Sequence, residues 1–150
     1  MNDVQTLDDI VRTLAEQGFS PVRNSGSVSV TVGGKEYPFP AVILMDETYL
    51  TVICKITTWG EMLSRIPVEE REDFHLAIYA MNSQMHSYAF TVLSDIDGEG
   101  EDKNQWPVGL INSIPVGDIS VGELLEQMRA LQAALITAKD VFSVRLVETV

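Results

Sequence analysis

Cysteine is almost absent from the 150-residue chain, in which Cys54 is the only example. A single cysteine cannot form an intrachain disulfide, which fits a reducing cytoplasm. Long apolar runs are absent as well, since none reaches the roughly 18 residues that a membrane-spanning helix requires. The N-terminus, MNDVQTLDD, has neither a basic start nor an apolar core, so no signal peptide is predicted. We therefore expect one cytoplasmic domain over residues 1–150, with no membrane contact.

Basic residues are scarce. Ten Lys and Arg stand against 22 Asp and Glu, and the net charge is −12. No two bases lie within five residues of each other, whereas nucleic-acid affinity depends largely on clustered cations that displace counterions. The acidic long-range field also repels a phosphate backbone. We expect no direct binding to DNA or RNA, and the acidity serves either solubility or partner choice.

Enzyme signatures are missing too. The sequence has no GxGxxG, GxxxxGK[ST], GxSxG or CxxC motif. Cys54 lies inside an apolar, strand-like run. Nothing in the sequence indicates a cationic neighbour that would activate the thiol, so we interpret Cys54 as a core residue. His75 and His86 fall on one predicted helix about 16 Å apart, too far to share a metal ion. We therefore predict no catalytic residue, no cofactor and no enzyme activity.

One acidic segment, residues 95–102, is similar to a calcium-binding loop. Asp95, Asp97 and Glu99 occupy loop positions 1, 3 and 5, and Gly100 occupies position 6. Position 12, which should be a bidentate Glu, is Trp106, and the flanking segments have the alternation of strands. We interpret the segment as a charged hairpin loop, and calcium or small-ligand binding remains the alternative.

The first half of the chain predicts a helix followed by three strands. Thr6 can cap a helix over 7–18, whose apolar residues recur at helical spacing. Strict alternation predicts a strand over 27–32, and Gly33-Gly34 suits a tight hairpin. Strands over 41–45 and 49–57 then complete an antiparallel meander, and residues 21–26 read as loop.

The second half predicts two helices separated by a hairpin. A short helical turn over 59–66 precedes a helix from Pro67 to about residue 87. Strands over 88–93 and 106–114 form the hairpin, and the capping box Ser120–Glu123 begins the last helix. The order α-β-β-β-α-β-β-α indicates an α+β fold, with a mainly antiparallel, five-stranded sheet packed by helices.

Three stretches carry a family resemblance. They are Ala77–Asn82, a helical segment with Asn82 ahead of the strand 88–93; the acidic turn DIDGEG; and IPVGDISVGELLEQM, which leads into the last helix. With the element order, they make residues 5–145 resemble the YbjN-like family, which shares the fold of type III secretion chaperones. The resemblance implies a small dimer-forming domain that binds other proteins, without cofactor or catalytic residue. Such chaperones hold unfolded client segments, and YbjN-like members are linked to regulation and the stress response.

The leading hypothesis is a non-enzymatic protein-binding module, chaperone-like or regulatory, whose partner is another protein. The alternative is a calcium or small-ligand sensor that uses residues 95–102. We also expect a homodimer, because strands 41–45 and 49–56 are apolar at nearly every position and need cover on both faces. Either the meander or the second hairpin could line that contact, unless helices of the same chain cover both faces.

Overall fold

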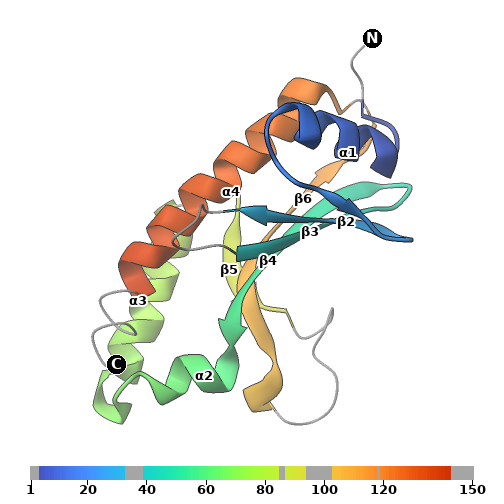
Figure 1. Ribbon diagram of the computed structural model, residues 1–150. Helices are drawn as coiled ribbons and strands as arrows, with labels where there is room; N and C mark the ends of the chain where they lie inside the picture. The colour runs from blue at the N-terminus through green and yellow to red at the C-terminus, as the bar shows by residue number, and fades with distance from the viewer. Residues whose placement is uncertain (1–3, 33–38, 85–86, 94–102, 118, 143–150) are drawn as a thin grey trace.

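The computed structural model describes residues 4–32, 39–84, 87–93, 103–117 and 119–142. Six antiparallel strands form one sheet that is packed by helices (Figure 1). The elements, in chain order, are α1 (Leu7–Glu16), β1 (Val22–Arg23), β2 (Ser27–Val32), β3 (Phe39–Met45), β4 (Tyr49–Thr58), α2 (Trp59–Ser64), η1 (Val68–Glu70), α3 (Arg71–Gln84), β5 (Ala89–Val92), η2 (Lys103–Gln105), β6 (Pro107–Pro115) and α4 (Val121–Phe142).

The strands lie in the order β1-β2-β3-β4-β6-β5. The predicted meander is confirmed as β2-β3-β4, and the predicted second hairpin as β5-β6. The two units join because β6 pairs with β4. The strand that comes first in the second hairpin, β5, is therefore left at the edge of the sheet.

The expectation of five strands and of a loop over 21–26 is wrong at β1. Val22 pairs with Ser29 and Arg23 with Val28, which adds a sixth strand. The turn is closed by Asn24, whose backbone N–H donates to the carbonyl of Ser27 at 2.9 Å. Two residues are too few to show an alternating pattern, so side-chain periodicity could not reveal this strand.

The predicted helix starts are held by side-chain caps. In α1, the Thr6 hydroxyl accepts from the Asp9 amide at 3.1 Å, and the Asp9 carboxylate accepts from the Thr6 amide at 3.0 Å. In α4, the Ser120 hydroxyl accepts from the Glu123 amide at 3.1 Å. Each cap satisfies amides that have no partner within the helix. The helix predicted from Pro67 begins as η1 and continues as α3.

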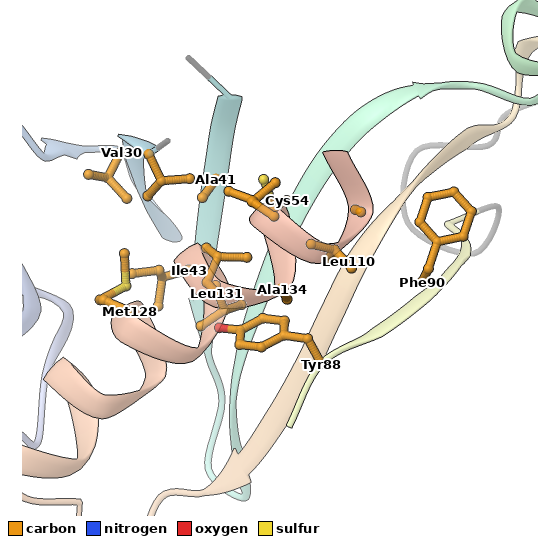
Figure 2. Close-up of a cluster of buried hydrophobic side chains, with 14 of the residues drawn as sticks. Val30, Ala41, Ile43, Cys54, Tyr88, Phe90, Leu110, Met128, Leu131 and Ala134 are labelled. Atoms are coloured by element: carbon orange, nitrogen blue, oxygen red, sulfur yellow. The ribbon is translucent and has the colours of Figure 1, made fainter. Parts of the chain in front are cut away.

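The core lies on one face of the sheet, where α1 and α4 cover it, and it also takes in Met62 of α2 and Phe74 and Met81 of α3 (Figure 1). Strand register places five apolar side chains in a row across this face, drawn in Figure 2: Val30, Ala41, Cys54, Leu110 and Phe90. The buried side chains of α4 close the same cluster from above, among them Leu124, Met128, Leu131 and Ala134.

A polar contact anchors α4 to the second hairpin. The Tyr88 hydroxyl donates to the backbone carbonyl of Gln127 at 3.2 Å, and the Asn112 side chain donates to the Gln127 side-chain oxygen at 2.6 Å. Burial raises the pKa of Tyr88 well above its ordinary value, so the phenol stays protonated and keeps donating. These bonds fix the position of α4 over the sheet in a way that apolar packing alone does not.

Candidate functional site

Cys54 is fully buried at the centre of the core, which confirms its predicted role. Burial raises the pKa of its thiol to about 12. A reactive cysteine needs the opposite shift, because the thiolate is the nucleophile. Cys54 is therefore a packing residue, and its chemistry at neutral pH is that of a small apolar side chain.

The acidic segment with Asp95, Asp97 and Glu99 lies outside the described residues, as does His86. β5 ends at Val92 before the segment, and the short 3-10 helix η2 (Lys103–Gln105) leads into β6 at Pro107 after it, whereas a calcium loop of the EF-hand type lies between two α-helices. The described ranges contain no group of three or more His, Cys, Asp or Glu side chains that could hold a metal ion. Calcium binding by residues 95–102 stays a prediction.

The described part of the chain has a cavity of about 270 Å³ between α3 and the edge strand β5. We call it the α3–β5 cavity. It is open to solvent, because His75, Tyr79 and Thr91 in its wall are exposed. Its lining residues come from the β4–α2 junction, from α3 and from β5: Trp59, His75, Ile78, Tyr79, Asn82, Phe90, Thr91 and Val92.

One end of the α3–β5 cavity is set by Asn82. Its side-chain oxygen accepts from the Phe90 amide at 2.8 Å, and its side-chain nitrogen donates to the Phe90 carbonyl at 3.1 Å. The carboxamide thus occupies the outer backbone groups of Phe90 as a neighbouring strand would. This bond pair holds α3 beside the sheet edge. The resemblance drew attention to Asn82, but its partner could be known only from the fold.

Another part of the cavity wall is an aromatic pair. The rings of Trp59 and His75 are stacked with centroids 6.0 Å apart and an interplanar angle of 18°. Trp59 is the first residue of α2, and His75 is exposed on α3, in agreement with its predicted surface position. Sixteen residues separate the two rings in the chain, so no local pattern could have signalled their contact.

The solvent-facing side of α3 carries large apolar side chains. Leu76 is 60% exposed and Tyr79 is 72% exposed, and they lie one turn apart on the same helix. Phe74 and Met81, by contrast, are buried in the core. The helix is therefore apolar on two sides, which explains why helical spacing alone identified its inner face but not the outer one.

A second surface is the face of the sheet that is turned away from α1 and α4, which we call the open face. Register places one residue from every strand in a row across it: Val22, Ser29, Val42, Ile53, Ile111 and Ala89. Ile53 is only 6% exposed yet lies outside the core cluster, because Val42 and Ile111 flank it on this face. Lys55 is the one charged residue among the described strand positions on this side.

These elements define an α+β protein in which an antiparallel sheet is packed by four helices. The chain has a YbjN-like fold. It is similar to the crystal structure of YbjN from E. coli, for which a role as a transcription regulator has been suggested, with a TM-score of 0.60 and 12% identity over 95% of this chain and 94% of that one. An uncharacterized protein from Methanothermobacter thermautotrophicus matches with a TM-score of 0.59 and 13% identity, over 92% of this chain and 97% of that one.

The similarity is one of fold, since such low identities carry no statement about activity. No protein-family model matches the sequence, and no curated protein does so either. None of the described helices has the length and apolar character needed to cross a membrane.

Proposed function

We propose that this protein is a non-enzymatic protein-binding module, chaperone-like or regulatory, which acts through protein–protein contacts. The observation that carries the proposal is the apolar outer side of α3. Leu76 and Tyr79 are 60% and 72% exposed there, and Val68, just ahead of the helix, is 72% exposed. Leu76 and Tyr79 lie one turn apart, and apolar side chains that are exposed side by side support an interaction surface.

The neighbouring features favour a protein as the partner. Tyr is among the side chains enriched at protein interfaces, and here it borders the α3–β5 cavity, where a partner side chain can be buried. The chain as a whole carries a net charge of −12 with isolated bases. A regulatory role, as suggested for the E. coli neighbour, is therefore proposed to run through proteins rather than through direct contact with DNA or RNA.

Site-directed photo-crosslinking tests the proposal. A photoreactive phenylalanine analogue at Tyr79 should yield discrete protein adducts in the native host. The same analogue at Glu126, which is exposed on α4, is the control and should yield fewer adducts. Adducts at position 79 that do not exceed those at 126, or adducts that are removed by nuclease rather than protease, would contradict the proposal.

A second variant separates binding from folding. Leu76→Ser removes an exposed side chain, so the melting temperature should change little, whereas crosslinking from position 79 should fall. If Leu76→Ser unfolds the protein, the adducts formed from position 79 are measured in Leu76→Ala instead, because alanine keeps the helix propensity.

We also propose that two copies associate through the open face. Its central residues are apolar and its surroundings are Ser and Thr, for example the pair Thr51 and Ser113, whose hydroxyls lie 2.8 Å apart. A nearly uncharged face on a strongly acidic molecule is compatible with a second copy of itself, because no unpaired charge is buried in the contact. The meander contributes most of this face, and β6 contributes Ile111.

A further inference from the structure

The outer edge of β5 has backbone groups directed at the α3–β5 cavity. Antiparallel pairing with β6 uses alternate residues of β5, and the Leu93 amide also donates toward β6, to the Pro107 carbonyl at 2.7 Å. Phe90 and Val92 therefore direct their N–H and C=O groups away from the sheet. Asn82 occupies those of Phe90. Within the described ranges, no strand lies outside β5 and no side chain bonds to those of Val92.

Asn82 shows which chemistry this edge accepts. Its carboxamide has the donor and acceptor of a peptide group and uses both on Phe90, at 3.1 and 2.8 Å. The groups of Val92 lie two residues, about 6.6–6.8 Å, further along the strand. Four residues of the facing helix, about 6 Å along its axis, separate Asn82 from Ile78. Between Ile78 and Val92 lies the cavity, where α3 supplies no second carboxamide.

We propose that the α3–β5 cavity binds an extended, basic peptide segment of a partner protein, whose backbone pairs with Val92 and whose apolar side chain fills the cavity. The inference rests on the proposed protein-binding function and names the class of segment that is bound. A residue in a hydrogen-bonded antiparallel pair with Val92 donates its N–H to the Val92 carbonyl and accepts from the Val92 amide. Its side chain then lies on the same face as that of Val92, which lines the cavity.

The cavity, at about 270 Å³, has room for an apolar side chain. Ile78, Phe90 and Val92 provide apolar contact for an aliphatic or aromatic group. The same side chains make the interior a poor place for a charged one.

The negative charge near the cavity and on the whole chain indicates which residues flank the apolar side chain of the bound segment. Glu72 precedes His75 by three positions and Tyr79 by seven, so its carboxylate lies on the same stripe of α3 as the cavity mouth. The net charge of −12 adds a long-range field of the same sign. Lys or Arg beside the apolar anchor is therefore favoured over Asp or Glu, and the Tyr79 ring offers a cation a further contact.

Nuclear magnetic resonance titration of the 15N-labelled full chain with acetyl-Lys-Leu-Lys-N-methylamide tests the inference. The largest shift changes should fall on Val92, Thr91 and Tyr79. Methylation of the leucine nitrogen removes the donor to Val92 and should weaken binding about fivefold. The Glu-Leu-Glu peptide should bind more weakly than the Lys-Leu-Lys peptide, by a ratio that shrinks at high salt.

Two matched variants on α3 localise the effect. Tyr79→Lys puts a cation at the cavity mouth and should weaken binding of the basic peptide about fivefold or more, whereas Ala80→Lys adds the same charge at an exposed position of α3 outside the lining and should change binding less than twofold. The spectra themselves report whether each variant is folded. Shift changes that map elsewhere, equal binding of the N-methylated peptide, or equal effects of the two variants would overturn the inference. So would Val92 shifts that follow protein dilution alone, since a second copy would then occupy the edge.

The crosslinking and titration experiments distinguish failure of the proposed function from failure of the peptide inference. Protein adducts at position 79 together with a failed peptide titration would retain the protein-binding module and reject only the extended segment. Peptide binding at Val92 without cellular adducts would retain the peptide-binding edge and reject the outer side of α3 as the surface that contacts a partner.

Discussion

Cys54 lies in the middle of the row of side chains that crosses the core face of the sheet. On β4 it stands between Ala41 of β3 and Leu110 of β6, and α4 covers it from above (Figure 2). The position was predictable from sequence, because alternation along an apolar strand directs Val52 and Cys54 to the same face. The depth of burial was not, because it depends on β6 joining β4.

We expect the Cys54 thiol to react slowly in the native protein. Its pKa is raised to about 12 by burial, so the thiolate is scarce and a reagent has no access. Labelling by a disulfide reagent at neutral pH should be at least about a hundredfold slower than in denaturant, since it must await opening of the core. Rapid labelling of the folded chain would contradict the packing role and reopen the question of catalysis.

Substitution of Cys54 gives a second measure of the same burial. Cys54→Ser should lower the free energy of unfolding by about 1–3 kcal/mol, because a hydroxyl without a partner replaces a thiol in an apolar site. Cys54→Ala is the control that removes the sulfur without adding a polar group. Urea unfolding of the unsubstituted protein and of the two variants measures the three free energies of unfolding. Ser and Ala variants of equal stability would show that the serine hydroxyl finds a hydrogen-bond partner.

Asp9 makes the stability of α1 depend on pH. Hydrogen bonds from the amide of Gln5, the Arg12 guanidinium and the amide of Thr6 lower its pKa from 3.8 to about 2. A depressed pKa in the folded state stabilises the protein above the unfolded value and loses that contribution as the carboxylate is protonated. Asp9→Asn should therefore be destabilising at pH 7. The difference in the free energy of unfolding between this variant and the unsubstituted protein should shrink as pH falls from 3.8 towards about 2. Asp8→Asn removes the same charge from the same turn without breaking the capping box, and a profile identical to that of Asp9→Asn would exclude the cap as the cause.

Sequence periodicity predicts a helix or strand only when the element has enough residues to show a repeat. Strands β2, β3 and β4 and helices α1 and α4 were predicted from alternation, helical spacing and caps, and all are present. β1 was missed because it has two residues and depends on pairing with β2. The α3–β5 cavity was missed for a related reason. Its walls combine Trp59, α3 and β5, and only the tertiary fold brings these together.

Gly109 lies where β6 approaches the backbone of β4 closely. A Cβ added there would fall on the carbonyl oxygen of Cys54 and lie 2.9 Å from the Cα of Lys55, next to the register shift between Lys55 and Thr57. We expect Gly109→Ala to destabilise the fold by about 1–3 kcal/mol, because backbone atoms must move. Gly122→Ala on α4 is the control. Its Cβ would meet only the Ser120 hydroxyl oxygen at 3.7 Å, so its stability should stay unchanged or rise by up to about 1 kcal/mol. Equal stability of the two variants in chemical denaturation would show that β4 and β6 adjust without cost.

The connection between β5 and β6 gives a test for the calcium alternative. Position 12 of the loop is Trp106 and the segment lies between β5 and η2 rather than between two α-helices, so we expect millimolar calcium to shift the melting temperature no more than the same concentration of magnesium does. Specific binding to the folded state must stabilise it by mass action. A calcium-specific rise that Asp97→Asn abolishes would establish a sensor and displace the prediction made from the sequence.

At the scale of the whole molecule, charge and apolar surface are separated. The chain carries −12, yet the described strand positions of the open face include one charged residue, Lys55. The apolar character of both strand faces was visible in the sequence at 41–45 and 49–56. Which side α1 and α4 pack on was not visible, because either side of an antiparallel sheet can serve as the packed one. The structure places α1 and α4 on the same side (Figure 1).

That arrangement leads to the last prediction, a homodimer through the open face. Light scattering across a hundredfold dilution should show a mass that rises from 16.6 kDa towards twice that value. Because each copy carries the same net charge of −12, added salt should screen the repulsion and tighten the dimer, the reverse of its effect on an association between opposite charges. Ile111→Lys introduces a charge at the centre of the face and should abolish association, whereas Thr31→Lys, at the exposed rim of β2, should weaken it less. A mass that stays at 16.6 kDa at high concentration and high salt would end the dimer proposal and leave the open face to a different partner.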